Sequence, residues 1–221
     1  MAAPHRRNLP KDLADPKWQR RPASRPKEIL DAAVQVFTET GFERATIAQV
    51  ARHAGVSPAL VVHYYRTKAD LFEAVVNERL VGFVAGEEAL LASHRGSYRE
   101  LLHQLVRRLW DHFWSTDAMG IALVVKAERA HFPECTRAVF QQLGERWRRL
   151  LEGVLEAGAR QGEFRVSGPH AARIVGAMVT GVVESTRCFG GVDPRPSSPD
   201  ELWAALITLL DHGVLAQGEK Q

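Results

Sequence analysis

A helix-start pattern that recurs along the chain constrains its fold more than any other feature. At four places Ser or Thr stands three residues before Asp, Glu or Gln, and an apolar stripe at helical spacing follows. The hydroxyl can accept from a free N–H of the first turn, while the second side chain reaches back or favours the positive helix end. The pairs are Thr46–Gln49, Thr67–Asp70, Ser97–Glu100 and Ser198–Glu201. With no convincing strand pairs or internal repeats, we expect an all-α protein.

The expected helices cover most of the chain beyond Pro26. Pro26 suits the first turn of a helix, and Gly41 suits the left-handed residue that ends one. Long helices are expected from Thr67 to about Ser93 and after Pro133. Further helices are expected after Ser97, over about 119–131, from Pro169 to about Arg187, and after Ser198.

Basic charge is concentrated at the N-terminus. Residues 1–27 carry eight Lys or Arg and two Asp, a net charge of +6, whereas the rest carries 21 basic and 24 acidic residues, a net −3. Such an arm suits a polyanionic partner, although a solvated leader that only aids solubility has the same composition. Residues 1–25 are rich in Pro and Arg without periodicity, so we expect a disordered basic arm there.

Composition and missing motifs disfavour several function classes. No apolar run is long enough to cross a bilayer, and the N-terminal charges are not followed by the apolar stretch of a secretory signal. Cys135 and Cys188 lie far apart, which indicates reduced thiols and a cytoplasmic location. His131 and Cys135 are separated by Pro133 and have no further ligands nearby, so we expect no metal and no cofactor. Without a nucleophile elbow, a phosphate-binding glycine loop or a His-Glu-x-x-His motif, we do not expect an enzyme.

The segment Thr46–Tyr65 carries the strongest functional signal. Thr46 and Ser57 are expected to cap two short helices, and Gly55 permits the positive φ of the turn between them. Two short helices joined in this way form a helix-turn-helix, whose second helix enters the major groove, although an ordinary αα-hairpin is the alternative. Residues 44–68 include no acidic side chain, so DNA phosphates would meet no negative charge there.

Three motifs follow one another between residues 27 and 76: T-G-F-x-x-A-T, I-x-x-V-A-x-x-A-G-V-S and H-Y-Y-x-x-K-x-x-L. They comprise Thr40-Gly41-Phe42, Ala45-Thr46, Ile47, Val50-Ala51, Ala54-Gly55-Val56-Ser57, His63-Tyr64-Tyr65, Lys68 and Leu71. This segment resembles the DNA-binding domain of the TetR family of transcriptional regulators. Gly162–Arg165 and Pro169–Ala172 resemble the family's sensor half less specifically. The resemblance implies a three-helix helix-turn-helix domain, expected over 26–73, and a larger helical ligand-binding and dimerisation domain over 74–217.

The resemblance and the positions together imply a set of DNA contacts. The expected residues are Arg25, Thr46, Ser57, Pro58, Ala59, Leu60, His63, Tyr64 and Lys68. Residues 58–60 are expected to touch thymine methyl groups, His63 or Tyr64 a base edge or the backbone, and the capping hydroxyls and Lys68 the phosphates.

Two positions depart from the family pattern. The family often has Gly at Ala59 and a phosphate-contacting Tyr at Val62, so that contact is not carried over. The second helix also has no Arg, Asn or Gln, so specificity is expected to rest on DNA shape, methyl contacts and the basic arm in the minor groove.

A single helix-turn-helix supplies little contact area, so we expect a homodimer on double-stranded DNA. By analogy with the family, the interface is expected in the helices at about 169–187 and 198–216. The row Ala172, Gly176 and Thr180, with Ala177 and Gly181 alongside, would let a second helix approach closely. Packing within one subunit is the alternative for this row.

Residues 95–185 form too large a segment merely to support a DNA reader. Six side chains are expected to line a pocket for a small apolar or aromatic effector, although such residues can equally be core: Trp110, Phe113, Trp114, Phe132, Trp147 and Met178. The resulting hypothesis is a homodimeric repressor that a small molecule releases from a palindromic operator. The alternative is a DNA binder whose C-terminal domain only dimerises or binds a protein partner.

Overall fold

The structure, a computed structural model, describes residues 25–189 and 197–214, and every regular element in this part is a helix. The α-helices are α1 (Arg25–Arg44), α2 (Ile47–His53), α3 (Pro58–Tyr64), α4 (Lys68–Val76), α5 (Gly82–Ser93), α6 (Tyr98–Ser115), α7 (Ala118–Ala127), α8 (Pro133–Val139), α9 (Arg146–Arg160), α10 (Pro169–Phe189) and α11 (Pro199–Val214). The expected all-α class is confirmed. The predicted basic arm lies outside the described residues, apart from Arg25.

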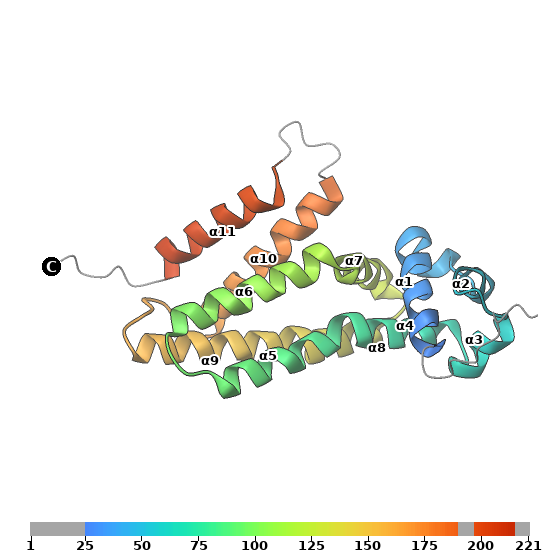
Figure 1. The fold of residues 1–221 in the computed structure, drawn as a ribbon, viewed down its shortest axis with the longest axis horizontal. Coiled ribbons are helices and arrows are strands. Elements are labelled where there is room, and N and C mark those ends of the chain that lie inside the picture. The colour runs from blue at the N-terminus through green and yellow to red at the C-terminus, as the bar shows by residue number, and fades with distance from the viewer. Residues whose placement is uncertain (1–24, 190–196, 215–221) are drawn as a thin grey trace, which may run out of the picture.

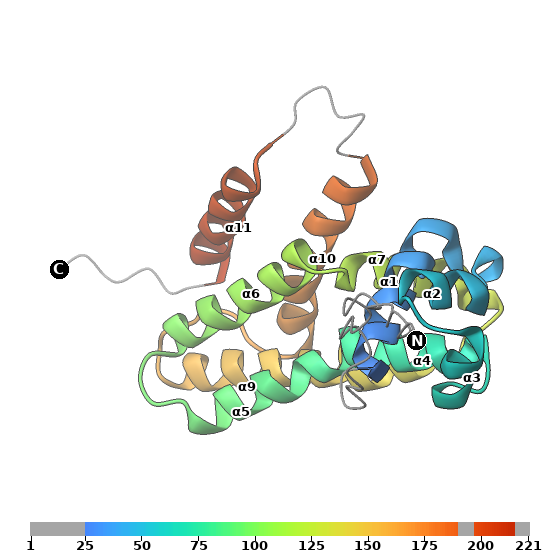
Figure 2. The same cartoon turned by 45° about the vertical axis from the view of Figure 1, so that its right-hand side comes forward.

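Helices α1 to α4 gather at one end of an elongated molecule, and the remaining helices extend away from them (Figure 1). Figure 2 shows α7 between α1 and the long helix α6. The close approach of α7 to α1 depends on Gly120, where a Cβ would lie 2.7 Å from Cγ2 of Thr38. Within the described residues, no helix has both the length and the apolar character needed to span a membrane.

The predicted helix starts and stops are confirmed in the structure. Thr46 and Thr67 each form a reciprocal capping box with the residue three positions on. Ser198 does the same with Glu201, whose backbone N–H donates to the Ser198 hydroxyl at 3.2 Å. Gly41 has φ 74° and breaks the helical geometry of α1 before Phe42. These boundaries follow from contacts within three residues, which sequence patterns capture well.

The two long helices predicted from the sequence each contain a π-helical turn that the sequence did not predict. Element η1 (Asn77–Val81) joins α4 to α5, and η3 (Phe140–Glu145) joins α8 to α9. A short 3₁₀ turn, η2 (Glu128–Ala130), follows α7. Helix α5, from the first of these interrupted helices, and α9, from the second, lie side by side (Figure 1). Because π turns interrupt the regular hydrogen-bond ladder, they often mark functional positions.

Helix α10 packs against α9 and α6. This packing contradicts the prediction that its row of small residues faces a second subunit. Ala172 is only 1% exposed, and a Cβ at Gly176 would lie 3.5 Å from Nε1 of Trp147. The row that contains Thr180 therefore faces its own subunit, as the alternative reading held. The outward face of α10 carries Gly181 instead, and exposed Ala177 lies at the rim of the cavity described below.

The N-terminus of α6 is capped by a residue distant in sequence. The Ser97 hydroxyl accepts from the backbone N–H groups of Arg99 and Glu100 at 3.1 and 3.4 Å. The second capping carboxylate, however, comes from Glu163 rather than Glu100. It accepts from the Ser97 hydroxyl at 2.6 Å and from the backbone N–H groups of Tyr98 and Arg99 at 3.1 and 2.9 Å. Partial desolvation opposes ionisation, but these hydrogen bonds lower the pKa of Glu163 overall.

A Glu163→Gln variant is expected to unfold more easily at neutral pH by about 1 kcal/mol, the usual size of a lost helix cap. Because the folded pKa of Glu163 is lowered, its contribution is present above the unfolded pKa and disappears as pH falls through the folded value. Urea unfolding of both proteins at pH 7 and pH 3 measures this difference. A gap between the two proteins that is as large at pH 3 as at pH 7 contradicts an ionic cap.

Candidate DNA-binding surface and ligand pocket

Helices α2 and α3 are held in a fixed arrangement by their caps and by the turn between them. The Ser57 hydroxyl accepts from the backbone N–H of Leu60 at 3.2 Å, which starts α3. Gly55 has φ 65°, and the N–H of Val56 donates to the carbonyl of Ala51 at 2.9 Å, which closes α2. The positive φ is the conformation that only glycine adopts without strain. The predicted helix-turn-helix geometry is therefore present.

The outward face of α3 is apolar and aromatic. Val61 is fully buried and Leu60 is partly buried, so these two residues anchor the helix. The exposed residues of α3 are Pro58, Ala59, Val62, His63 and Tyr64. Val62 and Tyr64 are 46% and 37% exposed, which places them among the few large apolar side chains on the surface of the described residues. A helix with one anchoring side and such an outward face is suited to contact a DNA groove.

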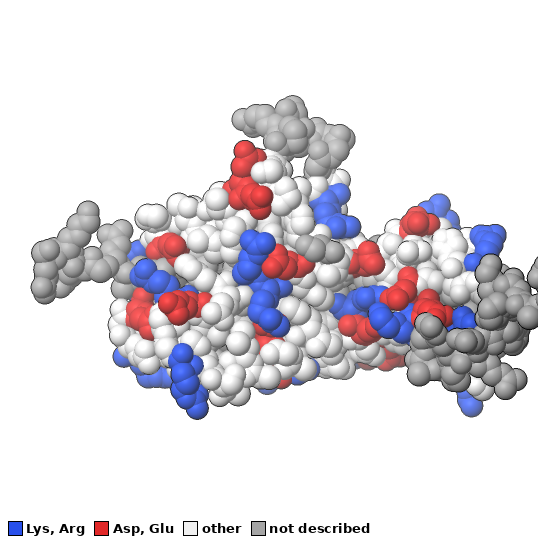
Figure 3. All heavy atoms as spheres, in the orientation of Figure 1, with Lys and Arg blue, Asp and Glu red and all other residues white. Residues whose placement is uncertain are grey.

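The stretch 44–68, which contains α3, has no acidic side chain, and its arginines are exposed. Arg52 and Arg66 lie on either side of α3 in sequence, and both are exposed. On the face drawn in Figure 3, Lys and Arg mix with Asp and Glu along the helices beyond α4. Arg25, a predicted DNA contact, forms an ion pair with Glu28 at 2.8 Å within α1.

Lys68 has a different environment from that expected of a phosphate contact. Its ammonium donates to the carbonyls of Phe42, Glu43 and Ala45 at 2.7, 3.0 and 2.9 Å. It also lies 4.3 Å from the centroid of the Phe42 ring. An ammonium has three donors, and all three are engaged inside the protein. Lys68 therefore fastens the start of α4 to the turn between α1 and α2, and thereby positions the helix-turn-helix.

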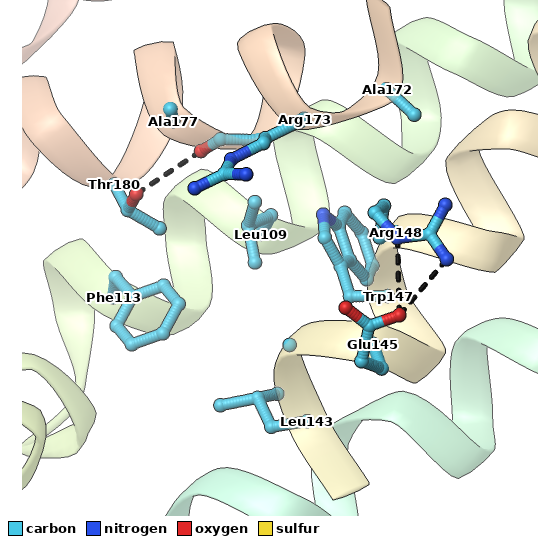
Figure 4. A pocket seen from close by; sticks show the side chains of 12 residues that line it. Leu109, Phe113, Leu143, Glu145, Trp147, Arg148, Ala172, Arg173, Ala177 and Thr180 are labelled. Atoms are coloured by element: carbon cyan, nitrogen blue, oxygen red, sulfur yellow. Dashed lines mark hydrogen bonds and ion pairs between the residues drawn. The ribbon is translucent and has the colours of Figure 1, made fainter. Parts of the chain in front are cut away.

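A cavity of about 240 Å³ opens among α6, η3, α9 and α10 (Figure 4). Its wall is largely apolar, with Leu109 and Phe113 from α6 and Leu143 from η3. Trp147 closes one side from α9, and the α10 residues from Ala172 to Thr180 form the side opposite. The volume lies just below the usual range of small-molecule sites, about 300–1,000 Å³, so a compact ligand suits it.

The six predicted effector contacts do not lie together. Phe113 and Trp147 line the cavity. Trp110 stacks on Trp114 with ring centroids 4.9 Å apart, and also meets Trp203 of α11 at 5.6 Å. Residues four apart on a helix share a face, so these two α6 side chains point toward α11 while Phe113 points into the cavity. The sequence offered no means to tell these two faces apart.

The other two predicted contacts are also packed elsewhere. Phe132 meets Phe42 edge-to-face at 4.3 Å, which places it at the junction between the helix-turn-helix end and the rest of the molecule. Met178 lies where α10 meets α6 and α11. The cavity instead uses small and charged residues that sequence reasoning did not select, among them Gly176, Arg148 and Arg173.

A chain of contacts links the cavity wall to α1. The His112 ring stacks on Phe83 at 4.3 Å and meets Phe113 edge-to-face at 5.2 Å. Burial lowers the pKa of His112, while a hydrogen bond to the backbone of Arg79 in η1 opposes that shift. The Arg79 guanidinium forms an ion pair with Asp31 of α1. These contacts run from the cavity wall, through the π turn, to the DNA-binding end.

Three metal-binding side chains meet at the same junction. The His131 ring nitrogens lie 3.4 Å from Glu43 and 3.1 Å from Glu128, and one donor atom from each of the three residues lies within 4.8 Å of the others. Two carboxylates and an imidazole could hold a divalent cation. Glu43 and His131 are exposed and already paired, so this cluster is equally an ordinary ion-pair network.

Two family models cover most of the chain. Residues 29–75 match the model described as bacterial regulatory proteins, tetR family. Residues 100–209 match the model described as the C-terminal domain of AefR-like transcriptional repressors. The first match covers α1 to α4 almost entirely, and the second covers the helices that form the cavity.

Curated relatives are transcriptional regulators rather than enzymes. The HTH-type transcriptional regulator BetI of Escherichia coli O157:H7 is 32% identical over 177 residues, which are 78% of this chain and 85% of the relative. The fatty acid metabolism regulator protein of Bacillus subtilis is 24% identical over 165 residues, 73% of this chain and 82% of the relative.

Solved structures share the fold. A regulator from Saccharomonospora viridis in complex with choline has a TM-score of 0.69 at 19% identity, covering 87% of this chain and 98% of that one. FadR from Bacillus subtilis in complex with stearoyl-CoA has a TM-score of 0.66 at 18% identity, covering 83% and 96%. At such identities the likeness establishes the architecture.

Proposed function

Since this chain belongs to the TetR family of bacterial regulatory proteins and is a DNA-binding transcriptional regulator, we propose that it acts as a homodimeric repressor. In this proposal a small molecule in the α6–α10 cavity releases the dimer from a palindromic operator in the cytoplasm. The DNA-binding unit spans residues 26–73 and the regulatory unit residues 74–217, with the division inside α4.

The observation that carries the proposal is the outward face of α3. Its exposed residues are held by the Ser57 cap on one side and by buried Val61 on the other. The face has no bidentate hydrogen-bonding side chain, so thymine methyl contacts and DNA shape supply the specificity. Tyr64 replaces the phosphate contact that Val62 lacks. Residues 1–24, outside the described part of the chain, supply the minor-groove contact with Arg25.

The dimer uses the outward faces of α10 and α11. Ile174 of α10 is 60% exposed and Leu209 of α11 is 64% exposed, which are high values for large apolar side chains. Gly181 lies on the same face of α10 as Ile174 and leaves room for a partner helix. Two such helices from each subunit form a self-complementary four-helix contact on a two-fold axis.

An Ile174→Gln variant is expected to weaken the dimer at least about tenfold, because it loses apolar burial in both copies of the interface. Val166→Gln is the matched control, since Val166 is also an exposed apolar residue, at 39%, but lies outside α10 and α11. Light scattering during gel filtration over a dilution series measures the monomer fraction. Equal dissociation of the two variants removes α10 from the interface.

Ligand binding is coupled to DNA release through η1. A ligand against Phe113 displaces α6, and the His112 ring carries that displacement to the backbone of Arg79. The Arg79–Asp31 ion pair then shifts α1 and with it the spacing of the two α3 helices in the dimer. A ligand that prefers the displaced state lowers the affinity of the protein for the operator. By thermodynamic linkage, operator DNA lowers the affinity of the protein for the ligand by the same factor.

Selection of bound sequences from random DNA tests the regulator proposal directly. The expected product is one palindromic motif, whose two half-sites match the two-fold axis of the dimer. Recovery of no preferred sequence contradicts operator recognition. A thermal-shift screen with a broad compound panel then tests sensing: stabilisation together with loss of DNA binding supports it, whereas silence across the panel favours a C-terminal domain that only dimerises or binds a protein.

A further inference from the structure

The wall of the cavity includes a tryptophan whose indole N–H is buried without a hydrogen-bond acceptor in the described residues. Trp147 is 7% exposed, and its Nε1 is buried without a hydrogen-bond partner in the described residues. The indole N–H is a donor only, and buried donors are normally paired. Nε1 lies against α10 at Gly176, where a Cβ would be 3.5 Å away. Figure 4 shows this edge of the indole turned toward α10.

Three charged residues line the cavity: two arginines, Arg148 and Arg173, and one carboxylate, Glu145. Arg148 donates to Glu145 at 2.9 Å and to Glu152 at 2.7 Å, so its charge is already compensated. The hydrogen bond from Arg148 lowers the pKa of Glu145, which stays ionised and paired. Arg173 is exposed and extends over the cavity in Figure 4, and its charge contributes to the lowered pKa of Glu145. Within the described residues its guanidinium forms no hydrogen bond or ion pair to an acceptor.

The remaining polar group adds no free donor. The Thr180 hydroxyl donates to the carbonyl of Gly176 at 3.1 Å. The cavity therefore offers two hydrogen-bond donors without an acceptor in the described residues, the Trp147 indole and the Arg173 guanidinium. Leu and Phe side chains form the wall below them. A ligand complementary to this set brings acceptor atoms at one end and apolar surface at the other.

From these contacts we infer that the effector is a compact, largely apolar molecule that ends in an anionic acceptor group, with a carboxylate as the simplest case. One acceptor atom receives the Trp147 N–H beside Gly176, and the negative charge pairs with Arg173 at the rim. This inference rests on the proposed function, since it names the ligand of the same cavity. A cationic head group gains nothing from either donor and is repelled by the positive charge of Arg173.

The volume of the cavity limits the size of the apolar part. About 240 Å³ equals roughly eight water molecules at ~30 Å³ each in the liquid. A short or medium chain fits within this volume, whereas a long acyl chain does not. Octanoate is therefore a suitable probe, with octanamide and octyltrimethylammonium as partners that share its tail but carry a neutral acceptor or a cation.

The test measures binding of the three probes to the full-length protein by calorimetry, without DNA. Octanoate is expected to bind most tightly, octanamide more weakly, and octyltrimethylammonium not measurably. Trp147→Phe removes the N–H but keeps an aromatic ring, and is expected to weaken octanoate and octanamide about tenfold each. Gly176→Ala provides a second variant of the same contact. Its Cβ would stay at ordinary contact distance, so the fold is kept while the acceptor is crowded.

Arg173→Gln separates the charge from the hydrogen bond. It is expected to weaken octanoate about fivefold and to leave octanamide unchanged, because only the carboxylate carries a charge. Arg149→Gln is the matched control, since Arg149 is an exposed arginine on α9 that does not line the cavity. Gel filtration of each variant checks that the dimer is preserved, so that a change in assembly is not mistaken for a change in binding.

Three results overturn the inference: no binding of octanoate, octyltrimethylammonium binding as tightly as octanoate, or octanoate affinity unchanged in Trp147→Phe, Gly176→Ala and Arg173→Gln. The selection of bound DNA sequences is run on the same protein and tests the proposed regulator function independently of ligand binding. Binding of octanoate without any operator leaves the ligand inference standing and the repressor proposal refuted. If only a cationic ligand releases the operator, the repressor proposal stands and the ligand inference is refuted.

Discussion

An Ala59→Asp variant is expected to lose at least about 100-fold in affinity for the selected operator while it keeps its fold. Ala59 is exposed at the second position of α3, directly after Pro58. A carboxylate at this position favours the positive end of the helix, so α3 is retained or slightly stabilised. On DNA the same charge faces the phosphates, and juxtaposed like charges cost several kcal/mol, about 2.7 kcal/mol of which accounts for 100-fold.

The matched control is Ala89→Asp, which places the same charge at an exposed position on α5, far from α3 along the molecule (Figure 1). It is expected to bind the operator as the parent protein does. Because salt screens the repulsion, the gap between the two variants should narrow as ionic strength rises. Circular dichroism confirms folding of both. If Ala59→Asp binds DNA as tightly as its control, α3 is not the reading helix.

A Gly158→Ala variant is expected to lose about 2 kcal/mol of unfolding free energy. A Cβ at this position of α9 would overlap the buried Phe164 ring at Cδ2 and Cε2, and would lie 3.0 Å from Cζ. An aromatic ring cannot bend away, so Phe164 must leave its site or α9 must shift, and overpacking of this kind costs about 1–3 kcal/mol or more. The better helix propensity of Ala returns only about 1 kcal/mol.

Gly153→Ala in the same helix is the control, because a Cβ there would meet only Leu91 Cδ2, at 3.9 Å. It is expected to be neutral or stabilising by up to about 1 kcal/mol. Urea unfolding of both variants at one protein concentration keeps the dimer contribution constant. A Phe164→Leu change should be less harmful in Gly158→Ala than in the parent protein. Equal stability of the two glycine variants would show that Phe164 does not pack on α9 in this way.

Much of the DNA-binding end could be read from the sequence because its geometry depends on near neighbours. The Thr46 and Thr67 caps bond to residues three positions on, and Gly55 and Gly41 need positive φ whatever surrounds them. The burial of Val61 beside exposed Ala59 likewise follows from helical periodicity. These are interactions between residues that the covalent chain already holds close together.

Other features of the same end were decided by distant contacts. Lys68 was expected at a phosphate, but its three donors meet carbonyls more than twenty residues earlier in the chain. No local pattern indicates that a lysine will meet a helix end from another segment. The same holds for Glu163, which caps α6 in the place that spacing assigned to Glu100.

The lining of the cavity is the feature that the sequence predicted least well. Composition alone predicted an aromatic pocket, and the helical all-α architecture around it was predicted correctly from caps and periodicity. Which aromatic side chains face the cavity depends on how α6 is rotated between α9 and α11, and that rotation separates Phe113 from Trp110 and Trp114. Tertiary packing alone set this rotation, because it is the sum of many weak contacts between helices that lie far apart along the chain.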